Sequence, residues 1–240
     1  MDNSFIIALF FSLGFFFESI FGFGGGLIAY FFLGFFIDIK EMIMAGLYVA
    51  TLASSYIAFS SRKYINFKII INLMPVAIFG SIFGVFSFNF FSTQFLSLIF
   101  AFLLLFLSFK NFFQKNNLIS QKTKNILLVT GSISQGIYGI GGPFIINAIK
   151  DKFANKHMLR ANMAVYFLFC NIVRIIHLLV TKNLPFEFIT NISWIIIPVF
   201  ISIFFGYFIH MKIKDEYFKK GIGIITLIAS LNFFYKAFFG

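Results

Sequence analysis

Residues 21–30 read FGFGGGLIAY, and four of the five positions from Gly22 to Gly26 are glycine. The stretch lies inside a run of Phe, Ile and Leu, about 5–37, that is long enough to cross a bilayer. Glycine weakens a helix and adopts the backbone angles of a tight turn at little cost. This stretch therefore predicts that the backbone breaks or reverses inside the membrane.

The composition makes lipid the solvent for most of the chain. Of 240 residues, 60% are hydrophobic and only 11% are charged, which leaves too little polar surface to cover a soluble globule. The net charge is +11, and the cations lie in short loops between apolar runs, which favours a role in membrane orientation over nucleic-acid binding. We expect a single membrane domain over 1–240, without cofactor or metal. The lone Cys170 has no partner for an internal disulfide.

Eight apolar runs follow one another along the chain. They cover about 5–37, 42–60, 67–88, 92–109, 125–149, 158–181, 188–210 and 218–238. The first and the fifth are interrupted by glycines, at Gly22–Gly26 (GFGGG) and Gly139–Pro143 (GIGGP).

The two interruptions predict an internal repeat. A shift of 117 positions pairs Glu18 with Gln135, Gly22 with Gly139, Gly24 with Gly141 and Gly25 with Gly142. After one gap, a shift of 116 pairs residues of the runs that follow, Lys40 with Lys156 and Ala45 with Ala161 among them. We interpret the chain as two repeats, 1–112 and 122–240.

The distribution of Lys and Arg distinguishes two topologies. If all eight runs cross the membrane, nine cations lie on each side, against the positive-inside rule. If the two glycine-broken runs turn back instead, fifteen lie on one side and three on the other. The three are Lys40, Lys182 and Lys236, and both termini are then outside.

The predicted fold class is therefore an all-α, multi-pass membrane protein of two inverted repeats. Each repeat has one glycine-broken, re-entrant segment and three transmembrane helices, an architecture that many secondary transporters share. Eight crossings with two kinked helices is the alternative, because a run as long as 125–149 also spans a bilayer as one bent helix.

A helix that begins at mid-membrane presents unpaired N–H groups and a positive dipole end to an anion. We therefore predict a binding site for a small anion at the two glycine tips. Its glycines are Gly22, Gly24, Gly25, Gly26, Gly139, Gly141 and Gly142. The alternative is that these glycines only allow close helix packing.

Several stretches resemble the TauE/SafE family of sulfite exporters. They are GFGGGLI in the first half, GIYGIGGPFI in the second, and INFKIIINLMPVAIFGSIFG, in which Asn66, Pro75, Gly80 and Gly84 match the family's tendencies. The resemblance implies a cytoplasmic-membrane transporter of small anions such as sulfite, sulfonates or thiosulfate. Two departures are Tyr30, where the family often has proline, and Pro143, where another glycine is common.

Three of the polar residues inside the apolar runs are candidates for a function. Glu18, one turn before the first tip, is a candidate for proton coupling, with a neutral structural role as the alternative. Arg174 is a candidate for binding the anion, unless it extends to the outer interface. Asn171 lies on the same helix face as Arg174.

The sequence lacks HExxH, GxSxG and a paired-aspartate motif, so an enzyme is not expected. An anion channel and a scaffold subunit that transports nothing remain as alternatives. The expected partners are a small anion and the lipid bilayer, and a homo-oligomer is compatible with the sequence.

Overall fold

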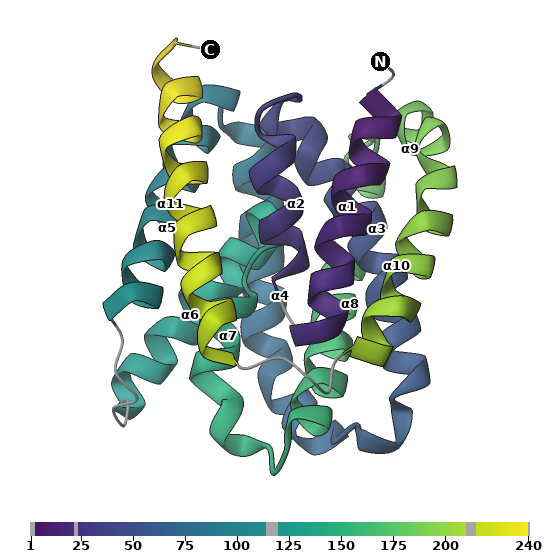
Figure 1. The fold of residues 1–240 in the computed structure, drawn as a ribbon, viewed down its shortest axis with the longest axis vertical. Coiled ribbons are helices and arrows are strands. Elements are labelled where there is room, and N and C mark those ends of the chain that lie inside the picture. The colour runs from purple at the N-terminus through teal and green to yellow at the C-terminus, as the bar shows by residue number, and fades with distance from the viewer. Residues whose placement is uncertain (1–2, 22–23, 114–119, 210–214, 240) are drawn as a thin grey trace. The chain divides into compact units, whose positions relative to one another are not determined.

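The computed structural model describes residues 3–21, 24–113, 120–209 and 215–239, and within them the chain is helical with no strand (Figure 1). The longer helices, in chain order, are α1 (Asn3–Phe21), α2 (Gly25–Leu33), α3 (Ile39–Ser60), α4 (Phe67–Phe90), α5 (Thr93–Phe113), α6 (Gln121–Tyr138), α7 (Gly142–Ile149), α8 (Lys156–Val180), α9 (Phe186–Asn191), α10 (Ile196–Ile209) and α11 (Asp215–Phe239). Short 3-10 turns are η1 (Arg62–Tyr64), η2 (Lys150–Lys152) and η3 (Ser193–Ile195). The prediction of an all-α protein is confirmed.

Among the described residues, three helices, α3, α4 and α8, are long and apolar enough to cross a membrane. Shorter apolar helical stretches cover Asn3–Ser19, Thr93–Phe109 and Ser193–Gly206. Large apolar side chains are exposed along these helices, among them Phe83 on α4, Phe106 on α5 and Phe204 on α10. Exposed phenylalanines in such numbers are expected where lipid, and not water, surrounds the helices.

Polar side chains just before four helices fix where those helices begin. Each accepts a hydrogen bond from a first-turn N–H group, which has no partner inside the helix. The pairs are Asn66 with Ile69 at 3.3 Å, Ser92 with Phe95 at 3.2 Å, Ser120 with Thr123 at 3.2 Å and Asn155 with Met158 at 2.9 Å.

The first glycine-broken run folds back on itself. Helix α1 ends at Phe21 and α2 begins at Gly25, and the two pack antiparallel. A Cβ on Gly14 would lie 2.3 Å from the Gly25 carbonyl oxygen, so the backbones touch there. Further from the break, the rings of Phe10 and Phe32 stack with their centroids 4.8 Å apart.

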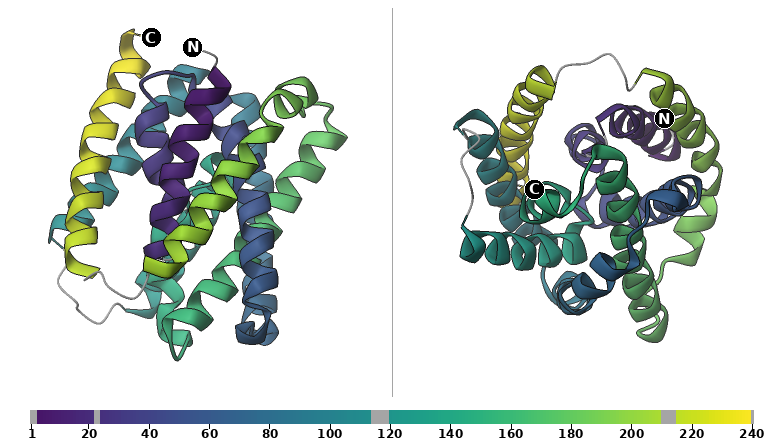
Figure 2. Two further views of the ribbon diagram at one scale, coloured as in Figure 1. Left: turned by 45° about the vertical axis from the view of Figure 1, so that its right-hand side comes forward. Right: turned by 90° about the horizontal axis from the view of Figure 1, so that it is seen from below.

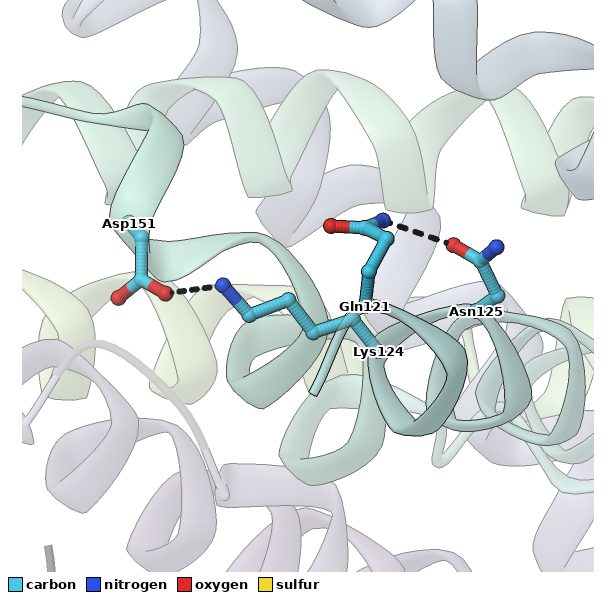
Figure 3. Close-up of polar contacts among 4 residues, drawn as sticks. All are labelled: Gln121, Lys124, Asn125 and Asp151. Atoms are coloured by element: carbon cyan, nitrogen blue, oxygen red, sulfur yellow. Dashed lines mark hydrogen bonds and ion pairs between the residues drawn. The ribbon is translucent and has the colours of Figure 1, made fainter. Parts of the chain in front are cut away.

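The second glycine-broken run forms the same kind of pair from α6 and α7. Gly131 faces Phe144 and Ile145, where a Cβ would lie 2.8 Å from each side chain. At the open end of the pair, Lys124 Nζ contacts Asp151 Oδ2 at 2.6 Å (Figure 3). The run 125–149 therefore begins and ends at the same end of this helix pair.

The helices group into two compact units, and each unit takes helices from both halves of the chain. One contains Met1–Ala45, Phe90–Leu118 and Asn191–Gly240, and the other contains Gly46–Asn89 and Ile119–Thr190. The α1–α2 pair thus lies in the first unit and the α6–α7 pair in the second.

In the first unit, α11 lies alongside α5 (Figure 1) and α1 lies alongside α10 (Figure 2). The aromatic rings of Tyr30 and Phe233 both pack edge-on against Phe100. The end of α11 is tied to the segment after α2, because Asn232 Nδ2 donates to the Gly34 carbonyl at 2.8 Å and Lys236 Nζ donates to the Ile37 carbonyl at 2.7 Å.

In the second unit, α4 and α6 approach closely because both carry glycine at the contact. A Cβ on Gly84 would lie 2.2 Å from the Gly136 carbonyl carbon, and one on Gly80 would lie 2.4 Å from the Ser132 carbonyl carbon. Small residues of this kind allow close backbone approach between membrane helices. The position of α6, and of the tip that follows it, depends on these glycines.

A buried asparagine joins the segment between α3 and α4 to the start of α8. Asn162 is fully buried, accepts from the Asn66 N–H at 2.8 Å and donates to the Tyr64 carbonyl at 3.0 Å. The rings of Tyr64 and His157 stack beside it, with centroids 5.6 Å apart. Residues 62–66 and 157–162 therefore lie at the same end of the second unit.

The apolar run 188–210 differs from the expected single segment. It is divided among α9, η3 and α10. Pro198 has no N–H group to donate and lies in the first turn of α10, a position where a helix tolerates proline. Apolar run length alone does not reveal this division.

Candidate functional site

The first glycine tip leads into α2 through a left-handed residue. Gly24 has φ 95°, a backbone conformation that residues other than glycine rarely adopt. The next residue, Gly25, donates its N–H to the Glu18 carboxylate at 2.9 Å, and the Ile28 N–H bonds to the Gly24 carbonyl at 3.1 Å. The side chain of Glu18 thus caps α2 from the preceding helix and lies at the positive end of the α2 dipole.

Gly25 is needed at this tip because of packing. A Cβ there would lie 2.7 Å from the Gly14 carbonyl oxygen and 2.8 Å from Glu18 Cβ. The packing interpretation of the glycines therefore accounts for this position.

The second tip is built in a similar way but with a neutral cap. Gly139 ends α6 with φ 74°, and the Gly141 N–H donates to Gln135 Oε1 at 2.8 Å. Ser134 Oγ donates to the Ile140 carbonyl at 2.6 Å, which satisfies a backbone group inside the turn. A Cβ on Gly141 would lie 2.1 Å from the Gly131 carbonyl oxygen, so Gly141 is also a packing glycine.

Two pairs of residues have matching roles at the two tips, and the structure makes one correction to the sequence alignment. Gly14 and Gly131 have the same role, and so do Glu18 and Gln135; both pairs are 117 positions apart. The capped glycines are Gly25 and Gly141, 116 apart, whereas the sequence pairing placed Gly25 with Gly142. The second tip is one residue shorter, and the gap lies inside the tip.

Helix α8 presents one face to the second tip. A Cβ on Gly142 would meet only Phe167, at 3.5 Å, and Arg174 donates to the Ile137 carbonyl over a long 3.4 Å. Asn171 lies between Phe167 and Arg174 on the same helix face, four and three residues away. The sequence-predicted Asn171 and Arg174 are thus brought to the segment 137–142.

Both of these polar side chains are buried. Arg174 is 2% exposed and Asn171 is 0% exposed. Arg174 therefore does not extend to an exposed interface within its unit, which was the alternative expectation for it. A buried guanidinium carries a charge that a bound oxyanion can neutralise with two parallel hydrogen bonds.

The chain was compared with models of known protein families. The family model described as "Sulfite exporter TauE/SafE" matches residues 6–233. The chain belongs to the TauE/SafE family. It is therefore a membrane protein of a family of exporters and permeases for sulfite and related anions. No match was found among curated proteins or among solved structures.

The residues that carried the resemblance to TauE/SafE have structural roles. Asn66 caps α4 and bonds to Asn162, while Gly80 and Gly84 seat α4 against α6. Tyr30, a departure from the family's proline, is 2% exposed and packs against Phe11 and Phe100. In this TauE/SafE protein a buried aromatic side chain thus fills the core of the first unit.

Sequence reasoning missed three parts of the second tip. Phe167 forms its wall, and Tyr166 shares a 2.7 Å hydrogen bond with Ser132 Oγ. Cys170 directly precedes Asn171 on α8 and is a buried cysteine that forms no disulfide. Their apolar or aromatic character is ordinary for a membrane helix, so no sequence signal marked them.

The predicted glycines divide between the units. Gly24, Gly25 and Gly26 lie with Glu18 in the first unit, and Gly139, Gly141 and Gly142 lie with Arg174 in the second. Gly22 lies outside the described residues. Within the described ranges no cluster of His, Cys, Asp or Glu has the makings of a metal site.

Proposed function

We propose that this TauE/SafE protein is a secondary transporter of small sulfur-containing anions, such as sulfite, sulfonates or thiosulfate, in the cytoplasmic membrane. The observation that carries the proposal is the second glycine tip, where the first residue of α7 faces Phe167 on α8, and the buried Arg174 on the same face of α8 reaches the Ile137 carbonyl. A buried guanidinium close to the start of a helix favours a small oxyanion over a cation or an apolar solute.

The proposed topology has two re-entrant segments, with six crossings and both termini outside. Three contacts, each inside one unit, support it: Lys124 with Asp151, Asn66 with Asn162, and Lys236 with the Ile37 carbonyl. Eight simple crossings would place the two members of each pair on opposite sides of the membrane. The fifteen-to-three distribution of Lys and Arg favours the same topology.

The two halves are proposed to be inverted repeats within this multi-pass protein. The matching roles of Gly14 and Gly131 support a duplication, and so do those of Glu18 and Gln135. Three crossings in each half give the halves opposite orientations, and mid-membrane sites built from broken helices are common in such transporters.

Proton coupling is assigned to Glu18. Its carboxylate accepts from the Gly25 N–H at 2.9 Å, and protonation would remove the charge that favours this contact. Gln135 cannot titrate, so only the first tip can respond to protons in this way.

The experiment is uptake and efflux in proteoliposomes containing the purified protein. A panel of sulfite, thiosulfate, a short sulfonate and a simple carboxylate is compared with and without a pH gradient. A transporter gives saturable flux and exchange of sulfur anions, a channel gives much faster unsaturable flux, and a scaffold gives none above empty liposomes. Absence of saturable sulfur-anion flux would overturn the proposed function.

Glu18→Gln separates coupling from transport in the same assay. The amide still accepts from the Gly25 N–H but does not titrate. We expect sulfite exchange to persist and the stimulation by a pH gradient to disappear. Equal stimulation of the variant and the unmodified protein would remove Glu18 from the coupling step.

A further inference from the structure

We propose that the two glycine tips are not equivalent anion sites: a single oxyanion binds at the second tip, through Asn171 and Arg174 beside Gly142, while the first tip is closed by the protein's own anion, Glu18. The inference rests on the proposed function and refines it from two tip sites to one. In this proposal, Asn171 and Arg174 bind the substrate at the second tip, and the carboxylate of Glu18 takes the place of an anion at the first.

At the first tip, the amide that a ligand would use already has a carboxyl group as its partner. The Gly25 N–H donates to Glu18 Oε2 at 2.9 Å. A hydrogen bond to an ionised carboxylate is about twice as strong as one between neutral groups. A second anion beside this carboxylate would be repelled by it in a medium of low dielectric constant.

At the second tip, the equivalent cap is neutral. Gln135 Oε1 accepts from the Gly141 N–H at 2.8 Å, but a carboxamide carries no net charge. The N–H of Gly142, the first residue of α7, has no partner inside the helix. The positive end of α7 and the guanidinium of Arg174 therefore favour an anion at this tip.

Asn171 provides independent support for a ligand at this place. It is 0% exposed, and within the described residues neither its Nδ2 nor its Oδ1 has a hydrogen-bond partner. Burying an amide without a partner costs about 1–3 kcal/mol, so such groups normally have a function. Phe167, one turn away on α8, faces Gly142, and Arg174, one turn away in the other direction, reaches the Ile137 carbonyl. The Asn171 side chain, which lies between Phe167 and Arg174 on this face of α8, is thus placed beside the second tip.

The chemistry of these groups defines the ligand. Nδ2 of Asn171 donates to an oxygen, and Arg174 donates through two parallel N–H groups. The backbone at Gly142 allows close approach, since a Cβ there would meet only Phe167 at 3.5 Å. A compact oxyanion with at least two oxygens, such as sulfite or a sulfonate head group, fits this donor set. Oδ1 of Asn171 accepts from a hydroxyl of a singly protonated anion.

Equilibrium binding of radiolabelled sulfite to the purified protein in detergent tests the inference. The unmodified protein is expected to bind one sulfite per chain. Asn171→Leu keeps the branched shape and removes the donor and the acceptor that would bind the anion, and we expect about ten- to hundredfold weaker binding. Gln135→Glu gives the second tip its own carboxylate, as in the first tip, and we expect a loss of similar size.

Ser54→Ala is the matched control, because Ser54 is also a buried polar side chain and belongs to α3, outside the proposed donor set. It is expected to bind sulfite as the unmodified protein does. If Asn171→Leu does not yield folded protein, Asn171→Ser serves in its place, with thermal unfolding as the check on folding. Gln135→Glu acts from a different helix and tests the same site independently.

Two results would overturn the inference while the proposed function stands: two sulfite sites per chain, or binding within about twofold of the unmodified protein for both Asn171→Leu and Gln135→Glu. If the unmodified protein neither binds nor transports any anion of the panel, the proposed function itself fails. The two failures are thus distinguishable.

Discussion

Lys124 Nζ lies 2.6 Å from Asp151 Oδ2 and closes the open end of the α6–α7 pair. Twenty-seven positions separate these residues, and the run between them turns back at the second glycine tip. The contact brings together two loops that a single crossing helix would hold on opposite sides of the membrane.

The Lys124–Asp151 contact predicts a pH-dependent difference in stability. The hydrogen bond from Lys124 lowers the pKa of Asp151 below its ordinary value, so the contribution is complete above about pH 3.9 and is lost as the pH falls through the lowered pKa. Asp151→Asn should therefore melt slightly below the unmodified protein at pH 7, and the two should converge in acid. Both groups are partly or fully accessible to solvent, so the difference is small. Thermal unfolding in detergent at several pH values measures it, and a difference that grows in acid would contradict the assignment.

The packing at the second tip predicts that substitutions at two neighbouring glycines differ in their effect on stability. Gly141→Ala places a Cβ 2.1 Å from the Gly131 carbonyl oxygen, so the α6–α7 pair must move apart, at a cost of about 1–3 kcal/mol. Gly142→Ala makes only an ordinary 3.5 Å contact with Phe167 and should leave the melting temperature nearly unchanged. Equal melting temperatures for the two variants would show that the packing is not as described.

A similar comparison tests the contact between α4 and α6. Gly84→Ala would drive a Cβ to 2.2 Å from the Gly136 carbonyl carbon, a backbone atom that cannot rotate away. We expect the free energy of unfolding to fall by about 1–3 kcal/mol. The neighbouring Phe83 is 47% exposed and serves as the control, since Phe83→Leu should change stability little. Chemical denaturation of both variants in mixed micelles gives the two values, and a Gly84→Ala variant as stable as Phe83→Leu would argue against the close approach.

The buried Asn162 predicts a structural role that depends on both ends of its carboxamide. Asn162→Ala leaves the Asn66 N–H and the Tyr64 carbonyl without this partner and should cost about 1–3 kcal/mol. Asn162→Asp keeps the acceptor but loses the donor and adds a charge, so it should be no more stable than the alanine variant. Melting temperatures of the three proteins test this, and full stability of Asn162→Asp would exclude a donor role.

The breaks in the two apolar runs were predictable from sequence because glycine is the residue that a reversal requires. The turn at Gly24 has φ 95° and the one at Gly139 has φ 74°, and both lie inside the quoted motifs. The repeat spacing was also predictable, because Gly14 and Gly131 follow the same 117-residue shift that the motifs gave. These features are local or periodic, and the sequence displays them directly.

The partners across each tip were not predictable. Glu18 is seven residues from Gly25 and was assigned to proton coupling, whereas its carboxylate also caps α2. The choice of Gly25, and not Gly24, as the partner of Gly141 depends on a one-residue difference in tip length that no identity revealed. Nothing in the sequence indicated that each unit takes helices from both halves, because helix–helix contacts between apolar faces leave no periodic signature of their partners.

The central claim, that both glycine-broken runs turn back within the membrane, is tested most directly by labelling single cysteines from one side. Cysteine replaces Lys40, Lys63, Lys124, Lys152 or Asn183 in separate variants, and intact cells are treated with a membrane-impermeant maleimide. The native Cys170 is buried, so the unmodified protein is the unlabelled control. We expect labelling from outside at positions 40 and 183, and labelling of positions 63, 124 and 152 only after the cells are opened. Labelling of positions 124 and 152 from different sides, or of 40 and 183 from different sides, would contradict the account.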